Sequence, residues 1–180
     1  AESFHVNSFF IGKNVRHTLF AGNGSYTPVF LSELPYLFRK KVLPLNVVLI
    51  HVSPPDSHGY CSLGVSVEAT LAAIENATTV IAQVNPQMPR TFGDGILHVS
   101  EIDYLVEVNQ PIFAHEMEKI SPLEDKIGTY IASLIEDEST LQMGIGSIPN
   151  AALAKLTNHK NLGLHTEMFS DGVIDLIEND

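Results

Sequence analysis

The chain has 180 residues, of which 44% are apolar and 17% charged, and its formal net charge is −11. The apolar fraction excludes a disordered chain and is enough for one large or two small globular domains. Only ten residues are lysine or arginine. A nucleic-acid partner is therefore not expected, since neutralising phosphates requires clustered basic side chains.

Neither a membrane span nor a disulfide is expected. No window approaches the roughly 18 uninterrupted apolar residues of a transmembrane helix, and the first residues lack a signal-peptide pattern. Cys61 is the only cysteine, so no internal disulfide can form, and a reducing compartment, the cytoplasm by default, is predicted. The chain starts without Met, which leads us to expect that the numbering begins inside a longer polypeptide.

Strand and helix patterns alternate in the first half of the chain. The basic run at residues 39–41 is interpreted as a solvated helix end. A β-branched run at 46–53 predicts a buried strand, residues 67–77 predict a helix, and residues 79–84 predict a second strand that ends before Pro86. This alternation predicts parallel βαβ units and an α/β fold.

A boundary is predicted between about residues 109 and 122, where polar residues and prolines interrupt the pattern. A helix should start directly after it, because Ser121 can cap, Pro122 suits the first turn and Glu124 completes a capping box. This helix is expected to run to about Asp137 and to bury five side chains: Ile127, Tyr130, Ile131, Leu134 and Ile135.

A second βαβ unit is expected after this helix, with a strand at 141–143, a helix at 149–156 and a strand at 162–165. A last helix should begin near Ser170 or Asp171, with Asp171 as its N-cap. These strands are too few to close a domain, so we expect a truncated molecule.

The most informative segment is the glycine turn at residues 141–150, Leu-Gln-Met-Gly-Ile-Gly-Ser-Ile-Pro-Asn. Glycines allow unusual backbone angles and the close approach of a ligand, and the following helix start leaves N–H groups unpaired. The turn therefore suits an anion or a developing oxyanion, although a plain strand-to-helix turn fits the same residues. It is neither a dinucleotide fingerprint, because Pro149 replaces the third glycine, nor a P-loop.

Three further polar segments follow predicted strands, at the position where ligands bind in open α/β sheets. The first, residues 51–64, fits a ligand site or a tight turn closed by the side chains of Asp56 and Ser57. A metal site is not favoured there, because the spacing of His51 and its neighbours is wrong for one. Cys61 is not favoured as a nucleophile, because it has no evident base.

The other two segments, residues 85–95 and 165–172, each contain one candidate side chain. Arg90 could bind a carboxylate or phosphate through two hydrogen bonds, and a structural ion pair is an equal alternative. Glu167 could act as a general base or nucleophile, although its spacing alone does not favour that role.

Taken in order, the four segments resemble the acetyl-CoA hydrolase / 4-hydroxybutyrate CoA-transferase family of class I CoA-transferases. The matching strings begin at Val52 (VSPPDSHGYCSLGVSV), Asn85 (NPQMPRTFGD), Gly144 (GIGSIPNA) and His165 (HTEMFSDGVIDLIE). With weaker similarity towards the N-terminus, the resemblance covers nearly the whole chain.

The resemblance implies a two-domain α/β enzyme with open, Rossmann-like parallel sheets, both incomplete in this chain. The N-terminal domain would occupy residues 1–115, with its start missing, and the C-terminal domain would begin at residues 116–180. Such enzymes act as homodimers or larger homo-oligomers on acyl-CoA and short-chain carboxylates. Coenzyme A is their substrate, and no cofactor or metal is implied.

The resemblance also implies a glutamate nucleophile, which forms an acyl-glutamyl anhydride and then a glutamyl-CoA thioester. It places this glutamate downstream of residue 180, so no catalytic residue is assigned within the chain, and the chain alone is expected to be inactive. The implied oxyanion and acyl-CoA-binding residues are Gly144, Gly146, Ser147 and Ile148. Candidates for lining the site are His58, Arg90 and Glu167.

Two other functions are left open by the sequence. Acetyl-CoA hydrolysis differs from transfer only in using water as the final acceptor. A non-catalytic CoA-binding or dimerisation module is the other, although the acidic composition argues against it, because the phosphates of CoA require basic partners.

Overall fold

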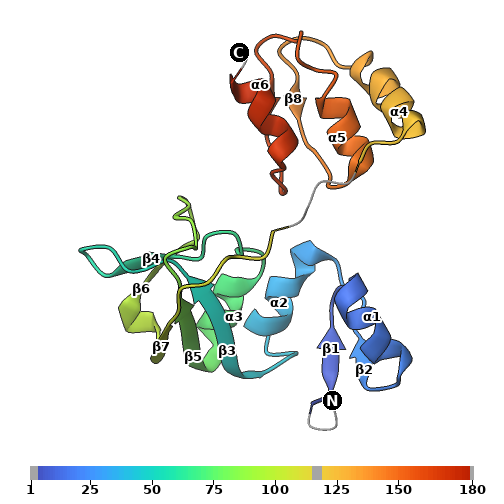
Figure 1. Ribbon diagram of the computed structural model, residues 1–180. Coiled ribbons are helices and arrows are strands. Elements are labelled where there is room, and N and C mark those ends of the chain that lie inside the picture. Colours follow the sequence, from blue (N-terminus) through green and yellow to red (C-terminus); the bar gives the residue numbers. More distant parts are fainter. Residues whose placement is uncertain (1–3, 115–118, 179–180) are drawn as a thin grey trace. The chain divides into compact units, whose positions relative to one another are not determined.

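The computed structural model describes residues 4–114 and 119–178. The chain divides into two compact units, Ala1–Ile112 and Phe113–Asp180. In Figure 1 the first unit runs from blue to yellow and the second from yellow to red. Each unit contains strands that pair in parallel across a connecting helix.

The main sheet of the first unit has three parallel strands, β3 (Leu45–Val52), β5 (Ala77–Val84) and β7 (Tyr104–Glu107), in the order β3-β5-β7. Helix α3 (Thr70–Asn76) connects β3 to β5. The register pairs Val48 with Val80 and places the carboxyl ends of both strands at the same edge. The predicted βαβ unit is therefore confirmed.

A second, short βαβ element precedes this sheet and was not predicted. Strands β1 (Val6–Ser8) and β2 (Gly24–Tyr26) pair in parallel across helix α1 (Lys13–Phe20). Each strand has only three residues, too few to show a periodic pattern in the sequence.

The predicted basic helix end is confirmed at the end of α2 (Leu34–Arg39), which follows the 3₁₀ turn η1 (Leu31–Glu33). Arg39 donates to Glu75 over 2.9 Å, and about half of each side chain is exposed to solvent. Exposed pairs of this kind contribute little stability.

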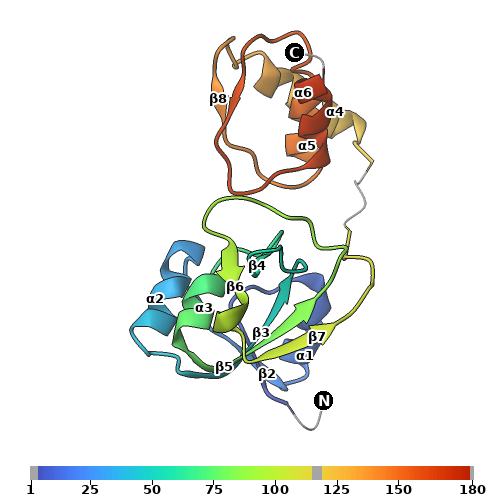
Figure 2. The ribbon, with the colours of Figure 1, turned by 90° about the vertical axis from the view of Figure 1, so that its left-hand side faces the viewer.

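One face of the main sheet is covered by an antiparallel pair, β4 (Tyr60–Ser62) and β6 (Ile96–His98), followed by the 3₁₀ turn η2 (Val99–Glu101). Figure 2 shows this pair and α3 beside the strands. The apolar core between them consists of Ile50, Val52, Cys61, Leu63, Ile74, Val80, Ala82, Val84 and Leu97. The opposite face carries exposed apolar residues, including Val47 and Leu49.

The second unit consists of α4 (Pro122–Ala132), β8 (Thr140–Leu141), α5 (Ser147–Leu153), β9 (Gly163–Leu164), the 3₁₀ turn η3 (Asp171–Val173) and α6 (Ile174–Glu178). Strands β8 and β9 pair in parallel, which confirms the second predicted βαβ unit. Its core contains Ala132, Leu153, Leu156 and Val173.

Helices α4 and α5 approach closely at a glycine. A Cβ atom added to Gly128 would lie 2.6 Å from the backbone carbon and oxygen of Ala151. The Gly128 side of α4 therefore faces α5, and Tyr130 points away from it, because two residues turn a helix by about 200°. Tyr130 and Leu134 are 62% and 82% exposed. The prediction that they are buried is wrong.

Two predicted helix boundaries also need correction. Helix α4 ends at Ala132 rather than near Asp137, because the N–H groups of Leu134 and Ile135 turn back to carbonyls three residues earlier, at 3.0 and 3.2 Å. The last helical segment is capped by Ser170 rather than Asp171, and its cap makes no side-chain hydrogen bond. The backbone of Ser170 is extended, whereas Asp171 already lies within the 3₁₀ turn.

Among the residues that the structure describes, no helix combines the length and the apolar character needed to cross a bilayer.

Candidate functional site

The turn after β3 is held by the side chain of Asp56. Its Oδ1 accepts hydrogen bonds from the N–H groups of His58 and Tyr60, each at 2.9 Å. Its Oδ2 accepts from Nη2 of Arg90 at 2.8 Å. The N–H of Tyr60, with smaller contributions from the N–H of His58 and the charge of Arg90, holds the pKa of the Asp56 carboxyl below its usual value. The tight-turn interpretation is confirmed for Asp56.

Arg90 connects two of the four segments. Besides Asp56, it donates from Nη1 to the carbonyl oxygen of Tyr60 at 2.9 Å. Both terminal nitrogens of the guanidinium therefore donate to the protein, and the side chains of the ion pair with Asp56 are about one third exposed. The structural ion pair is the alternative that the geometry supports for this residue.

A buried hydroxyl joins the same two segments a second time. Oγ of Ser62, which is fully buried, accepts hydrogen bonds from the N–H groups of Gly64 and Thr91 at 3.1 and 3.0 Å. It also lies 3.1 Å from the carbonyl oxygen of Thr91, to which it can donate. These polar residues therefore hold the loops in place.

Two further residues of the first segment differ in exposure. Cys61 is fully buried, and burial raises the pKa of its thiol, which makes it a poor nucleophile. His58 lies exposed at the tip of the turn. It therefore stays a candidate for contact with a ligand.

The glycine turn in the second unit connects β8 to α5 and has backbone N–H groups available at the start of the helix. Gly146 has a φ of +118°, a backbone conformation that favours glycine, and α5 starts at the next residue. The first hydrogen bond of the helix runs from Asn150 to the carbonyl of Gly146 at 3.2 Å. Within the described part of the chain, the N–H groups of Ser147 and Ile148 have no assigned acceptor.

The structure brings the segment of Glu167 next to this turn. Strands β8 and β9 are parallel neighbours with Leu141 paired to Leu164, so the residues that follow each strand leave at the same edge. The hydroxyl of Thr166 accepts from the N–H of Met143 at 3.1 Å and lies 3.0 Å from its carbonyl oxygen. Glu167 follows directly and is exposed. Sequence analysis found both segments, but only strand pairing places them together.

A carboxylate from α4 also reaches the glycine turn, and sequence analysis assigned it only a capping role. The capping box is confirmed: the N–H of Ser121 donates to Oε2 of Glu124 at 2.7 Å, and the N–H of Glu124 donates to Oγ of Ser121 at 3.3 Å. In addition, the hydroxyl of Ser147 donates to Oε1 of Glu124. The hydroxyls of Ser121 and Ser147 and the N–H of Ser121 lower the pKa of Glu124 to about 2.

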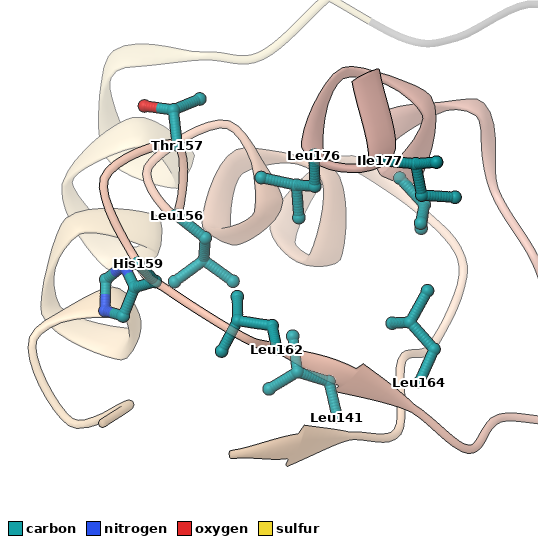
Figure 3. Close-up of a pocket in the computed structure, with 9 residues that line it drawn as sticks. Leu141, Leu156, Thr157, His159, Leu162, Leu164, Leu176 and Ile177 are labelled. Carbon is teal, nitrogen blue, oxygen red and sulfur yellow. The ribbon is translucent and has the colours of Figure 1, made fainter. Parts of the chain in front are cut away.

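A separate apolar cavity of about 60 Å³ lies between α6 and the two short strands of this unit. Figure 3 shows leucine side chains from both sides surrounding it. Neither Glu167 nor the part of the glycine turn from Gly144 to Ile148 lines this cavity. Its residues are Leu141, Leu156, Thr157, His159, Leu162, Leu164, Val173, Leu176 and Ile177.

Across the described residues, no group of three or more His, Cys, Asp and Glu side chains is arranged to hold a metal ion.

Parallel βαβ units and a glycine turn at a helix start define an α/β protein with a candidate anion-binding site. Residues 1–115 match the acetyl-CoA hydrolase/transferase N-terminal domain. The chain belongs to this family, which confirms the resemblance found in the four segments.

The chain is similar to known CoA-transferases both in sequence and in structure. The chain is 53% identical to a succinyl-CoA:acetate/propanoyl-CoA:succinate CoA transferase of Fasciola hepatica, over 97% of this chain and 37% of that protein. It is 51% identical to a 4-hydroxybutyrate coenzyme A transferase of Clostridium kluyveri, over 97% and 41%. The crystal structure of a 4-hydroxybutyrate CoA-transferase from Porphyromonas gingivalis superposes with a TM-score of 0.83 at 42% identity, over 97% of this chain and 45% of that one.

The chain thus spans about two fifths of the length of the curated relatives it matches.

Proposed function

We propose that the polypeptide containing this chain transfers coenzyme A between an acyl group and a free carboxylate. The observation that carries this proposal is the glycine turn at the shared edge of β8 and β9, where backbone N–H groups at the start of α5 have no acceptor among the described residues. Family membership supports the reaction type.

The names of the relatives support acyl-CoA and short-chain carboxylates as substrates. The two similar relatives act on succinate, acetate, propanoate or 4-hydroxybutyrate, according to their names. An acetate or 4-hydroxybutyrate type of specificity is the corresponding proposal for this chain. Coenzyme A enters this reaction as a substrate rather than as a bound cofactor.

The glycine turn, Gly144 to Ile148, is proposed as the oxyanion and acyl-binding loop. When a carboxylate attacks a thioester carbonyl, negative charge develops on the carbonyl oxygen, and N–H donors placed beside it stabilise the transition state. The N–H groups of Ser147 and Ile148 can take this role, because no protein acceptor in the described residues occupies them. Gly144 and Gly146 leave the approach to them open.

We propose that the nucleophile is a glutamate downstream of residue 180, as the resemblance implied, and that Glu167 lines the site. The carboxylate of the downstream glutamate would attack the thioester carbon, releasing CoA as a thiolate and leaving an acyl-glutamyl anhydride. The thiolate then attacks the glutamyl carbonyl, which releases the first acid and leaves glutamyl-CoA. A second carboxylate repeats the two steps in reverse order and leaves with CoA.

The two candidate residues of the first unit are proposed to act in different ways. His58 is proposed as a residue that contacts the substrate, because it is exposed on the turn. Arg90 is proposed to act through the shape of that turn, because its guanidinium is already bonded to Asp56 and Tyr60.

Acetyl-CoA hydrolysis is the alternative function, and a non-catalytic binding module is the less supported one. Residues 1–115 and 116–180 are proposed as parts of the N-terminal and C-terminal domains. The single cysteine supports a reducing compartment, so a cytoplasmic location is proposed. A homodimer or larger homo-oligomer is proposed from the family resemblance.

The test is an exchange assay with acetyl-CoA and isotopically labelled succinate, propanoate or 4-hydroxybutyrate, using the natural polypeptide that contains residues 1–180. Transfer of CoA to one of these acids, faster than hydrolysis, is expected. Hydrolysis that acetate or the labelled acids leave unchanged would favour the hydrolase instead. Neither reaction in folded protein would overturn both enzymatic functions.

The role of Glu167 is tested with the variant E167Q and the matched control D171N, which removes another carboxylate of the same segment. E167Q should lower the transfer rate by about 10-fold, because a residue that lines the site helps to orient the substrate but takes no part in the covalent steps. D171N should stay within about threefold of wild type. A transfer rate of E167Q equal to that of D171N would contradict a role in the site, and a loss of about 1,000-fold or more would make Glu167 the nucleophile instead.

A further inference from the structure

The carboxylate of Glu124 joins the starts of two helices. It belongs to the first turn of α4, where Oε2 accepts from the N–H of Ser121 at 2.7 Å. Its other oxygen, Oε1, accepts the hydroxyl proton of Ser147, the first residue of α5. The side chain therefore connects the capping box of α4 to the residue that follows Gly146.

The contact with Glu124 limits the hydrogen bonds that the side chain of Ser147 can make. A hydroxyl has one hydrogen to donate, and Ser147 donates it to Glu124. The hydroxyl is therefore not available as a donor to a ligand. The backbone N–H groups of Ser147 and Ile148 remain as the donors of the glycine turn.

The bonds to Glu124 are charge-assisted, because the carboxylate is ionised at neutral pH. Such hydrogen bonds are about twice as strong as those between neutral groups. The neighbouring residues of the turn, by contrast, have few constraints. Gly144 and Gly146 are exposed, and a Cβ atom added to Gly146 would meet no atom within 4 Å.

We infer that Glu124 is a positioning residue, which holds Ser147 and thereby orients the backbone N–H groups of Ser147 and Ile148 for the developing oxyanion. This inference rests on the proposed function, because the turn matters for catalysis only if the thioester binds there. Nothing in the sequence pattern distinguishes this role from plain helix capping.

A matched control exists in the next residue. Asp125 lies in the same turn of α4 and forms an ion pair with Lys155, just after α5, with 2.6 Å between Oδ1 and Nζ. It also ties α4 to the α5 region, but it does not contact the glycine turn. The variant D125N therefore tests whether loosening the helix pair is enough to change the reaction.

The kinetic experiment compares E124Q, S147A and D125N in the natural polypeptide that contains this chain. E124Q and S147A should lower kcat for CoA transfer by about 10- to 100-fold, while KM for acyl-CoA stays within about twofold, since misplaced donors weaken transition-state binding most. D125N should leave kcat unchanged. Equal losses of kcat in E124Q and D125N, or no loss in E124Q, would overturn the inference.

A second measurement does not depend on activity. The side-chain methyl groups of Ile145 and Ile148 flank Gly146, so their NMR order parameters report the mobility of the turn. Both should fall in E124Q and S147A and stay unchanged in D125N, and unchanged values in E124Q would contradict the positioning role. A folded wild type without transfer activity would refute the proposed function, and the order parameters would still decide whether Glu124 holds the turn.

Discussion

Arg90 and Asp56 lie 34 residues apart in the sequence and form an ion pair of 2.8 Å, from Nη2 to Oδ2. The same guanidinium donates from Nη1 to the carbonyl oxygen of Tyr60. The turn after β3 is therefore stabilised in two ways. Arg90, from a distant segment, binds Asp56, and the N–H groups of His58 and Tyr60, within the turn, donate to the same carboxylate. Two of the most recognisable segments of the sequence thus form one supported loop.

The first prediction concerns the two-pronged contact of Arg90. R90K should lower the melting temperature by roughly 2–4 °C, because one ammonium group cannot take both the carboxylate and the carbonyl in the fork geometry. R39K is the matched control, since Arg39 donates two hydrogen bonds to the exposed carboxylate of Glu75 and, within the described residues, none to a main-chain carbonyl. It should change the melting temperature by less than about 1 °C. Equal decreases in the melting temperatures of R90K and R39K, measured by calorimetry, would show that the hydrogen bond from Arg90 to the Tyr60 carbonyl contributes no stability.

The second prediction concerns the contact between α4 and α5. G128A should destabilise the protein by about 1–3 kcal/mol, because the new methyl group would meet the backbone of Ala151 at 2.6 Å, where only movement of a helix relieves the overlap. In G144A the added Cβ would lie 3.6 Å from the ring of Pro149, an ordinary contact. Urea unfolding should therefore show a large loss for G128A and a small one for G144A. The reverse order would contradict the packing described for α4 and α5.

The third prediction concerns pH. The pKa of Glu124 is about 2 in the folded state, below its ordinary value of 4.5. The unfolded state therefore binds more protons between these values, and the stability contributed by Glu124 is lost as the pH falls through this range. The melting temperatures of wild type and E124Q should differ at pH 7 and at pH 5 and converge as the pH approaches 2. A difference that grows towards low pH would contradict this sign.

The βαβ unit of β3, α3 and β5 and the start of α4 could be predicted because they have clear sequence patterns, whereas the short unit of β1, α1 and β2 could not. The β-branched run before Pro54 and the capping box at Ser121 are local signals, and both correspond to observed elements. The burial of Tyr130 and Leu134 could not be predicted in the same way. Helical periodicity marks apolar positions, but the side that faces α5 is chosen by Gly128, whose missing Cβ lets the helices approach.

The candidate site was predictable in parts rather than as a whole. The glycine turn and Glu167 each stood out by composition, yet their proximity depends on the pairing of β8 with β9, which no local spacing reveals. Arg90 was correctly limited to two roles, and only the distance to Asp56 favours the ion pair. The reach of Glu124 to Ser147 depends on the packing of two helices, so capping rules alone could not find it.

The central claim is that the polypeptide containing this chain transfers CoA through a glutamyl-CoA thioester on a glutamate downstream of residue 180. The most direct measurement is mass spectrometry of peptides from that polypeptide, after incubation with acetyl-CoA and rapid acid quenching. The account predicts a CoA thioester on a glutamate beyond residue 180, in wild type and in E167Q alike. A CoA adduct on the peptide that contains Glu167, or none in a protein that transfers CoA, would contradict it.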